Sequence, residues 1–310
     1  MRALVTGANG FVGSSLCGAL ISRGINVNRC VRNSDFKCDT FSTGEVDGLT
    51  DWRLPLKGCD VVVHLAGRAH QLADRNPDPL EEFRRINVRG SLALFSQAAH
   101  FGVKRFVYVS SIGVNGNENA VPYTESDVPQ PREPYAISKF EAEVGLQKLA
   151  AETGVELVII RPPLVYGPGA PGNFGRLVRW MRMGIPLPLG SIHNRRSLVA
   201  LGNLTDFIEE CLKNPAAANQ IFLVSDGEDI STTELLKRIA FLTQKSDRLL
   251  PLPTAWVEKL AMMMGQASSA RRLCRDLRVD ISKARDLLGW SPPLTLDEGL
   301  LLAMNGVDRK

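Results

Sequence analysis

The stretch Gly7-Ala8-Asn9-Gly10-Phe11-Val12-Gly13 follows the short apolar run 3–6 and opens a segment, 11–23, with helical periodicity. Such a turn needs glycine for a tight change of direction, for the approach of a pyrophosphate to the backbone, and for close packing of helix on strand. Free N–H groups and the helix dipole favour the anion there. We therefore predict a bound dinucleotide. Its predicted contacts in this turn are Gly7, Asn9, Gly10, Phe11, Val12 and Gly13.

Outward from this turn, short β-branched runs alternate with helical stretches. The predicted strands are 3–6, 27–31, 60–65, 105–109 and 157–161, and the predicted helices are 11–23, 79–99 and 135–152. This alternation predicts an α/β fold with a doubly wound parallel sheet. Prolines then interrupt the chain between 162 and 190. We expect a dinucleotide-binding domain at 1–165 and a smaller, mostly helical substrate-binding part at 166–310, with strands near 197–200 and 221–224 as candidates for return to the first sheet.

The composition argues against several other classes of protein. The 310 residues carry a net charge of only +4, and Lys and Arg are scattered, which argues against a nucleic-acid partner. The six cysteines and four histidines lack metal-ligand or disulfide spacing, so no metal is expected. No apolar run has the length of a membrane span, and no signal peptide precedes the first strand. These features predict a cytoplasmic protein.

The end of the second predicted strand bears on the type of dinucleotide. Units that bind NAD usually place Asp or Glu about 20 residues on, to hold the ribose 2′-hydroxyl. Here Arg32 stands at that end and the first acid is Asp35. A guanidinium suits a 2′-phosphate, so Arg32 favours NADP over NAD. The alternative is a solvated surface arginine, which leaves both dinucleotides open.

Two side chains at the start of the predicted helix 135–152 suggest catalysis. Tyr135 and Lys139 lie four residues apart, which puts them on one helix face. A nearby ammonium lowers the pKa of a phenol, so Tyr135 is expected to transfer a proton near neutral pH. Ser110 and Ser111 follow the strand 105–109 at the edge where doubly wound folds bind ligands. The sequence therefore predicts a hydroxyl, a phenol and an ammonium beside the dinucleotide.

These motifs together resemble the extended short-chain dehydrogenase/reductases, and more narrowly the nucleotide-sugar epimerase/dehydratase family, with a Rossmann fold. The resemblance covers nearly the whole chain, with the motifs in the family's order. They are the glycine turn, His64-Leu65-Ala66-Gly67, Asn87-Val88-Arg89-Gly90-Ser91, Ser110-Ser111, Tyr135-x-x-x-Lys139 and Arg161-Pro162-x-x-Val165-Tyr166-Gly167-Pro168.

The resemblance implies a role for each matching residue. Ser111 hydrogen-bonds the reacting oxygen, Tyr135 is the general acid/base, and Lys139 holds the nicotinamide ribose and tunes Tyr135. The register from Val114-Asn115-Gly116 favours Ser111 over Ser110, although Asn115 replaces the family's usual aromatic residue. Asn87 is expected to support the site rather than to catalyse. Further implied contacts of the dinucleotide are Leu65, Ala66, Gly67, Asn87, Tyr135, Lys139 and Pro162.

The second half of the chain carries the implied substrate contacts. Asn173 resembles the asparagine that contacts a nucleotide diphosphate, and Arg196 resembles the arginine that clamps it. Arg271 is the candidate for a second diphosphate-binding arginine, with its neighbour Arg272 as the alternative. A solvated basic surface is the competing interpretation of these arginines. The apolar stripe Trp256, Leu260, Met263 and Met264 is expected in the core or over the substrate pocket, not on a membrane, because its polar face carries few cations.

The closing segment, 280–292, resembles bacterial surface-polysaccharide enzymes. The favoured activity is reduction of a UDP-4-keto-6-deoxy-N-acetylhexosamine at C4, because Arg32 suits the NADPH that a reductase consumes. The alternative is a UDP-hexose 4-epimerase with retained NAD. A non-catalytic dinucleotide-sensing protein is a remote third, since such proteins usually lose the catalytic Tyr or Lys. The expected partners are a UDP-linked sugar and a second copy of the chain, forming a homodimer.

Overall fold

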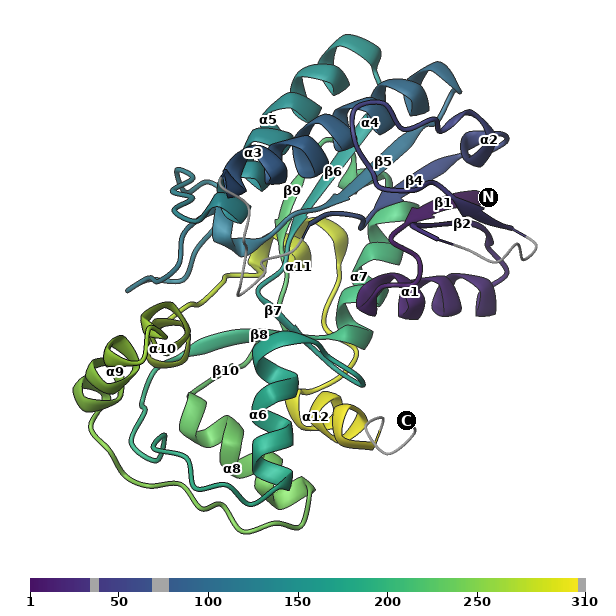
Figure 1. Cartoon of the computed structure of the whole chain (residues 1–310). Coiled ribbons are helices and arrows are strands. Elements are labelled where there is room, and N and C mark those ends of the chain that lie inside the picture. Colours follow the sequence, from purple (N-terminus) through teal and green to yellow (C-terminus); the bar gives the residue numbers. More distant parts are fainter. Residues whose placement is uncertain (34–38, 69–77, 306–310) are drawn as a thin grey trace.

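The computed structural model describes residues 1–33, 39–68 and 78–305, and its larger lobe is built on a seven-stranded sheet (Figure 1). The strand order is β3-β2-β1-β4-β5-β6-β9. Every neighbouring pair is parallel, so the predicted doubly wound sheet is confirmed. The strands are β1 (Arg2–Thr6), β2 (Asn26–Val31), β3 (Thr40–Ser42), β4 (Val61–His64), β5 (Arg105–Val109), β6 (Glu156–Arg161) and β9 (Ile221–Leu223).

Helices cover both faces of this sheet, because its strands are buried on both sides. One buried apolar cluster joins the sheet to α1, α7 and α11, and another joins it to α2, α4 and α5. The helices of the first face are α1 (Phe11–Ser22), α7 (Leu201–Lys213) and α11 (Ser282–Leu288). Those of the second face are α2 (Arg53–Leu56), α4 (Gly90–His100) and α5 (Pro134–Thr153). Short 3₁₀ turns are η2 (Ile112–Val114) and η3 (Pro215–Ala217).

The helix expected at 79–99 is a continuous helical run of three segments. It begins with α3 (Pro79–Phe83), passes through the π-helical turn η1 (Arg84–Arg89), and continues as α4. Asp78 caps its start by accepting a hydrogen bond from the backbone N–H of Glu81 at 3.1 Å. The π turn adds a residue to the helical repeat and brings buried Asn87 toward the sheet edge.

The order of the strands reverses between β1 and β4. From β1 the chain proceeds outward to β2 and β3, and it then returns to β4 on the other side of β1. In doubly wound folds the carboxyl ends of the strands at such a reversal form the ligand-binding crevice. The segments that follow β1 and β4 are therefore expected to border the ligand-binding crevice.

The smaller lobe is mostly helical and contains a second sheet of three strands, β10-β8-β7. Its apolar cluster is formed chiefly by α6, α8 and α12 together with this sheet. Of the two later strands considered for return to the large sheet, β9 joins it, whereas β8 belongs to the small sheet and that expectation was wrong. The elements are β7 (Leu164–Tyr166), α6 (Gly172–Arg182), β8 (Arg196–Ala200), β10 (Asp229–Ile230), α8 (Thr232–Leu242), α9 (Thr254–Met263), α10 (Ala267–Cys274) and α12 (Leu296–Asn305).

The prediction for the apolar stripe of helix α9 was also wrong. Its apolar stripe was expected in the core or as a cover of the pocket, yet most of it faces outward. Trp256 is 58% exposed and Met263 is 77% exposed. The helix is instead anchored to the lobe through Val257 and Ala261, which are both buried. Helix α9 has two apolar faces, and helical spacing alone does not show which of them packs against the rest of the protein.

Candidate active site

The glycine turn lies directly after β1, at the reversal of the strand order. Gly7 has φ +64°, a conformation that side chains other than glycine rarely adopt. A Cβ on Gly13 would lie 2.1 Å from the carbonyl oxygen of Gly7, so no side chain fits there. The backbone N–H of Gly10 donates to the same carbonyl oxygen at 2.9 Å. The turn therefore presents bare backbone at the start of α1, as a pyrophosphate requires.

A cavity of about 450 Å³ extends from this turn to the end of β2. Its walls include Gly7, Gly10 and Ala66 on one side and Arg32 on the other. The side chain of Arg32 is exposed to solvent. Asp35, the first acid after β2, lies outside the described residues. Among the residues described, Glu45 is the acid that lines this cavity, and it was not predicted because it lies in an irregular segment beyond β3.

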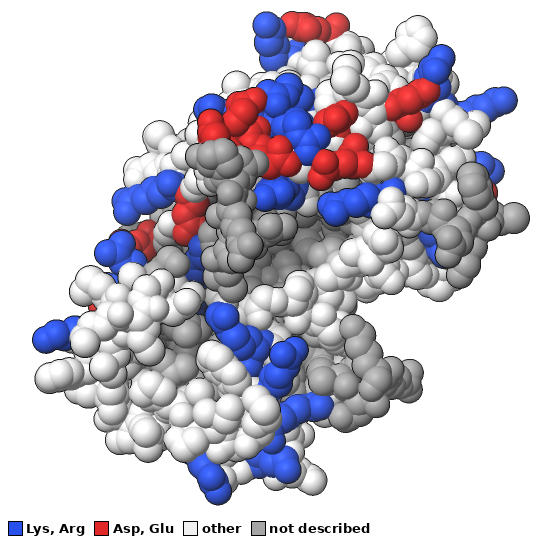
Figure 2. All heavy atoms as spheres, in the orientation of Figure 1, with Lys and Arg blue, Asp and Glu red and all other residues white. Residues whose placement is uncertain are grey.

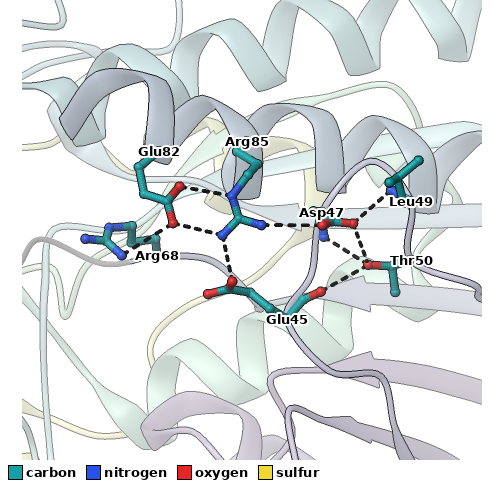
Figure 3. A network of polar contacts seen from close by, with 7 residues as sticks. All are labelled: Glu45, Asp47, Leu49, Thr50, Arg68, Glu82 and Arg85. Carbon is teal, nitrogen blue, oxygen red and sulfur yellow. Dashed lines mark hydrogen bonds and ion pairs between the residues drawn. The ribbon is translucent and has the colours of Figure 1, made fainter. Parts of the chain in front are cut away.

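Glu45 is held in a network of ion pairs around Arg85 of η1 (Figure 3). Arg85 Nη2 lies 2.6 Å from Glu45 Oε2 and 2.8 Å from Glu82 Oε1, and its Nη1 lies 3.4 Å from Asp47. These carboxylates, Glu82 foremost, raise the pKa of Arg85. Glu82 also lies 3.8 Å from Arg68, which follows β4. The network therefore ties the wall of the Arg32 cavity to the segment after β4.

A second cavity, of about 330 Å³, continues from the glycine turn to the end of β5. It shares Gly7, Gly10, Leu65 and Gly67 with the first cavity, so the two form one groove. An extended dinucleotide fits a groove that runs over a glycine turn in this way. The new wall is formed by residues predicted to be catalytic or to contact the dinucleotide, namely Phe11, Val12, Gly13, Ser111, Tyr135, Lys139 and Pro162.

The two serines after β5 differ in their hydrogen bonds. Ser111 Oγ accepts a hydrogen bond from the N–H of Gly113 at 3.1 Å and begins η2. Ser110 Oγ is buried, lines the same cavity, and has no hydrogen-bond partner among the described residues. A buried hydroxyl without a partner is costly, so an unpaired Ser110 Oγ fits a cavity that receives a polar ligand. Sequence register had placed Ser110 second to Ser111.

Lys139 is buried beneath Tyr135 on the same face of α5. Its Nζ donates to the carbonyl oxygen of Val109 at 2.9 Å and lies 4.5 Å from the centre of the Tyr108 ring. Burial lowers the pKa of Lys139 to about 8, and Glu143, one turn further along α5, opposes this effect. The ammonium is therefore held at the end of β5 and is close to its titration point at neutral pH.

The expected effect of Lys139 on Tyr135 is not seen. Burial raises the pKa of Tyr135 to about 12, whereas the sequence led us to expect a lowered value. The reason is that burial penalises the phenolate, and Lys139 is directed at Val109. The phenol of Tyr135 is consequently protonated at neutral pH in this structure.

Asn87 connects the segment after β4 to α5. Its Oδ1 accepts from the backbone N–H of Arg68 at 2.8 Å, and its Nδ2 donates to the carbonyl oxygen of Arg68 at 3.1 Å and to Ser138 Oγ at 3.0 Å. A Cβ on Gly67 would lie 2.9 Å from Asn87 Oδ1. Asn87 therefore fixes the floor of the groove between the glycine turn and α5.

A third cavity, of about 420 Å³, lies in the smaller lobe and has Tyr135 in its wall. Asn173, Arg196 and Arg272 line it as well, together with apolar side chains of α6 and α8. Burial, and then repulsion from Arg272, lowers the pKa of Arg196 to about 10. Two guanidinium groups that repel each other in one cavity are stabilised by an anion between them. Tyr135 lines this cavity and the dinucleotide groove, so it stands where the two meet.

Arg271 does not line the third cavity, and Arg272 occupies the place that we assigned to it. Arg271 is exposed and lines a neighbouring cavity of about 430 Å³. On α10 it is Arg272, one position after Arg271, that points into the third cavity. The sequence alone does not show which of these two neighbours faces inward. Arg272 Nη2 also lies 2.7 Å from Glu133 Oε2, immediately before α5. Asn173 Oδ1 accepts a hydrogen bond from Arg176 at 2.6 Å.

A doubly wound sheet with a glycine turn at its strand reversal, and a serine, a tyrosine and a lysine in the same groove, defines a dinucleotide-dependent enzyme. The comparison with known families makes this specific. Residues 3–225 match the model of the NAD dependent epimerase/dehydratase family. The chain belongs to that family, as the resemblance of its motifs indicated.

Relatives of known activity cover almost the whole chain. A UDP-glucose 4-epimerase of Vibrio cholerae is 45% identical over 96% of this chain and 92% of that protein. An N-acetyl-α-D-glucosaminyl-diphospho-ditrans,octacis-undecaprenol 4-epimerase of Escherichia coli O157:H7 is 29% identical over the same shares. The crystal structure of a UDP-glucose 4-epimerase with UDP-glucose from Thermotoga maritima has a TM-score of 0.80 and 26% identity, and covers 99% of this chain and 98% of that one.

Among the described residues, no helix has the length and apolar character needed to cross a membrane.

Proposed function

We propose that the protein is a 4-epimerase of a UDP-linked hexose, which it oxidises and re-reduces at C4. The observation that carries this proposal is the position of Tyr135, which borders both the dinucleotide groove and the cavity with Arg196 and Arg272. A sugar whose diphosphate lies between those arginines has its ring beside the phenol. The relative from Vibrio cholerae supports epimerisation over the other reactions of the family.

The side chains divide the proton and oxygen chemistry among them. The glycine turn at Gly7, Gly10 and Gly13 would hold NAD, which would supply a reversible hydride acceptor, and return of the hydride to the opposite face of the keto sugar would invert C4. Tyr135 removes the proton of the C4 hydroxyl in the oxidation and donates a proton to the C4 oxygen in the return. Ser111 Oγ is the hydrogen-bonding partner of that oxygen. Lys139, which is protonated below its pKa of about 8, supplies the positive charge that the phenolate needs.

A C4 reductase is the second candidate, and Arg32 favours it. Arg32 is exposed in the groove at the end of β2, where a 2′-phosphate of NADP would be recognised. A reductase consumes the reduced dinucleotide, whereas an epimerase regenerates its own. The acceptor of this second reaction is a UDP-4-keto-6-deoxy-N-acetylhexosamine. Glu45, in the same cavity, supports NAD, because a carboxylate can accept a hydrogen bond from the ribose 2′-hydroxyl.

One set of assays separates these candidates. The purified chain is incubated with UDP-glucose, with UDP-N-acetylglucosamine and with the 4-keto sugar, each with and without NADH or NADPH, and the products are identified by NMR. Interconversion of UDP-sugars without added dinucleotide is the expected result. Reduction of the keto sugar at the expense of NADPH, with no interconversion, would replace epimerase by reductase. Turnover in neither assay would overturn both.

The group that carries the sugar diphosphate is a further part of the proposal. The relative from Escherichia coli O157:H7 acts on a sugar joined by a diphosphate to undecaprenol. A lipid diphosphate and a nucleoside diphosphate share the anion that Arg196 and Arg272 suit. We therefore include a lipid-linked sugar diphosphate as a second substrate class for the same chemistry at C4.

A further inference from the structure

We propose that α9 and α10 form a docking surface for an anionic lipid bilayer. This inference rests on the proposed function, since it supplies the setting in which the cavity with Arg196 and Arg272 would meet a lipid-linked sugar diphosphate. The surface consists of the exposed apolar side chains of α9 and the cations beside them. The apolar members are Trp256, Leu260, Met262, Met263 and Met264, and the cations are Lys259 and Arg271.

The apolar side chains of this surface are open to solvent. Trp256, Leu260 and Met263 recur at helical spacing on one face of α9 and are 58%, 43% and 77% exposed. Met262 and Met264 extend the patch at the end of the helix, with exposures of 65% and 70%. Several large apolar side chains exposed together mark an interaction site, because burying each of them away from water is favourable. Trp with flexible methionines suits the irregular boundary of a bilayer.

Exposed cations lie on α9 and on the neighbouring helix α10, as an anionic membrane surface requires. The Nζ of Lys259 lies 5.5 Å from the centre of the Trp256 ring, and Arg271 is exposed on α10. Arg275 is also exposed, although Glu258 pairs with it at 2.9 Å. In Figure 2 the surface over α9 and α10 is mostly uncharged, with basic side chains at its edge. The apolar stripe of α9 has few cations of its own, and α10 adds Arg271 to this surface.

Of these two helices, α10 reaches the cavity that we propose for the sugar diphosphate. Arg272 and Leu273 of α10 line that cavity, while Arg271 beside them faces outward. Helix α10 is tied to α9 by the pair of Arg275 and Glu258 and by a hydrogen bond from the N–H of Gln266 to Ala261. A bilayer seated on α9 is therefore next to the helix that carries the diphosphate-binding arginine. This continuity favours a membrane over an unrelated partner.

Vesicle binding tests the docking surface directly. The full chain is floated with vesicles of phosphatidylcholine, with and without phosphatidylglycerol, and the emission of its indoles is recorded. Trp52 and Trp290 are buried, and Trp180 is partly buried against the core of the smaller lobe. Trp256, which is 58% exposed, is therefore the indole expected to shift to shorter wavelength when apolar surroundings replace water. We expect flotation with the anionic vesicles, reduced by salt, and little with phosphatidylcholine alone.

Matched variants assign the binding to α9. Trp256→Ser with Met263→Ser is expected to abolish flotation, and Lys259→Gln to weaken it roughly fivefold, as the loss of one cation near an anionic surface predicts. Phe241→Ser is the control, because Phe241 is 83% exposed on α8, away from this surface. All these variants should turn over a UDP-sugar at the wild-type rate, since none of the changed residues lines the cavities of the site.

Two results would overturn the inference. One is absence of flotation and of the emission shift for the wild-type chain. The other is loss of self-association, measured by light scattering, in the Trp256 and Met263 variant, because the patch would then be covered by a second copy. Failure of the proposed function is distinguishable: vesicle binding would persist while no sugar is turned over. Conversely, turnover of UDP-sugars without vesicle binding would leave the proposed function intact.

Discussion

Tyr135 lies in the walls of two cavities. It follows Pro134 at the start of α5, where the helix begins at the edge of the large sheet and faces the smaller lobe. Its ring lies 6.1 Å from that of Phe83, and burial keeps its phenol protonated. A protonated phenol can act as a base only if a neighbouring positive charge stabilises its phenolate, and Lys139 is the candidate for that charge.

Replacement of Tyr135 by Phe should therefore remove turnover and spare the dinucleotide. In the proposed function the phenol carries the proton, so we expect kcat to fall by roughly 10²–10⁴-fold, the usual contribution of general acid–base catalysis. NAD binding, measured by calorimetry, should change little because the ring remains. A variant that loses both turnover and NAD affinity would show that Tyr135 mainly shapes the groove.

The two adjacent arginines of α10 give a sharper prediction. Arg272 lines the cavity that we propose for the sugar diphosphate, and Arg271 does not. Arg272→Ala should raise KM for a UDP-sugar by roughly 10- to 100-fold, as loss of charge-assisted hydrogen bonds predicts. Arg271→Ala is the matched control and should leave KM for that water-soluble substrate nearly unchanged. Equal effects of the two changes would contradict the assignment of Arg272.

At the scale of elements, β4 is joined to β1 and α4 through His64. Thr6 Oγ1 accepts from the N–H of Leu65, so its own hydrogen is free for His64 Nδ1 at 2.7 Å. Ser91 Oγ donates to the carbonyl of Asn87 and lies 2.9 Å from His64 Nε2. The imidazole is therefore neutral, with hydrogen on Nε2 only. Burial, and then the charge of Lys139, lowers the pKa of His64 to about 3.

This histidine should make the fold sensitive to acid. Between the ordinary pKa near 6.5 and about 3, the unfolded chain binds a proton that the folded chain does not, so stability falls as pH falls. The slope is on the order of 1.4 kcal/mol per pH unit from this group alone. Denaturant unfolding at several pH values should show that slope reduced in His64→Gln. His100→Gln, on the exposed end of α4, is the control and should keep it.

The large sheet was predictable because its central strands are short apolar runs separated by helical periodicity. Strand β3 was missed, since Thr40–Ser42 is three residues long and partly polar. The assignment of β8 to the small sheet depends on pairing with β7 and β10, which no local pattern encodes. The candidate catalytic residues Ser111, Tyr135 and Lys139 could be named from their spacing, and the structure places them in the wall of one cavity. The choice between Arg271 and Arg272, and the raised pKa of Tyr135, depend on burial that a sequence does not state.

At the scale of the molecule, two faces remain available for association. One is the docking surface of α9 and α10, and the other is the outer side of α4 and α5 (Figure 1). Val144, in the middle of α5, is 50% exposed, and Phe101 at the end of α4 is 36% exposed. A homodimer through these two helices was expected from family resemblance, and we retain it as a prediction.

A charge placed on α5 should separate such a dimer. Val144→Glu puts an unpaired carboxylate into the predicted interface, which costs far more than exposure to water. Light scattering should then report a monomer, whereas the wild type and Val121→Glu, changed at an exposed position outside α5, remain dimeric. A monomeric wild type at micromolar concentration would exclude this interface.

The ion pair of Arg272 with Glu133 links the cavity of the smaller lobe to the start of α5, where Tyr135 lies. Glu133 stands two residues before Tyr135, so a diphosphate bound at Arg272 would compete with this carboxylate for the guanidinium at the start of α5. Part of the binding energy of the diphosphate would then lower the activation barrier at C4 instead of only strengthening substrate binding. A free hexose lacking the phosphates should accordingly be a slow substrate even at saturation, and its kcat, compared with that of the UDP-sugar, measures how far the anchor drives the reaction.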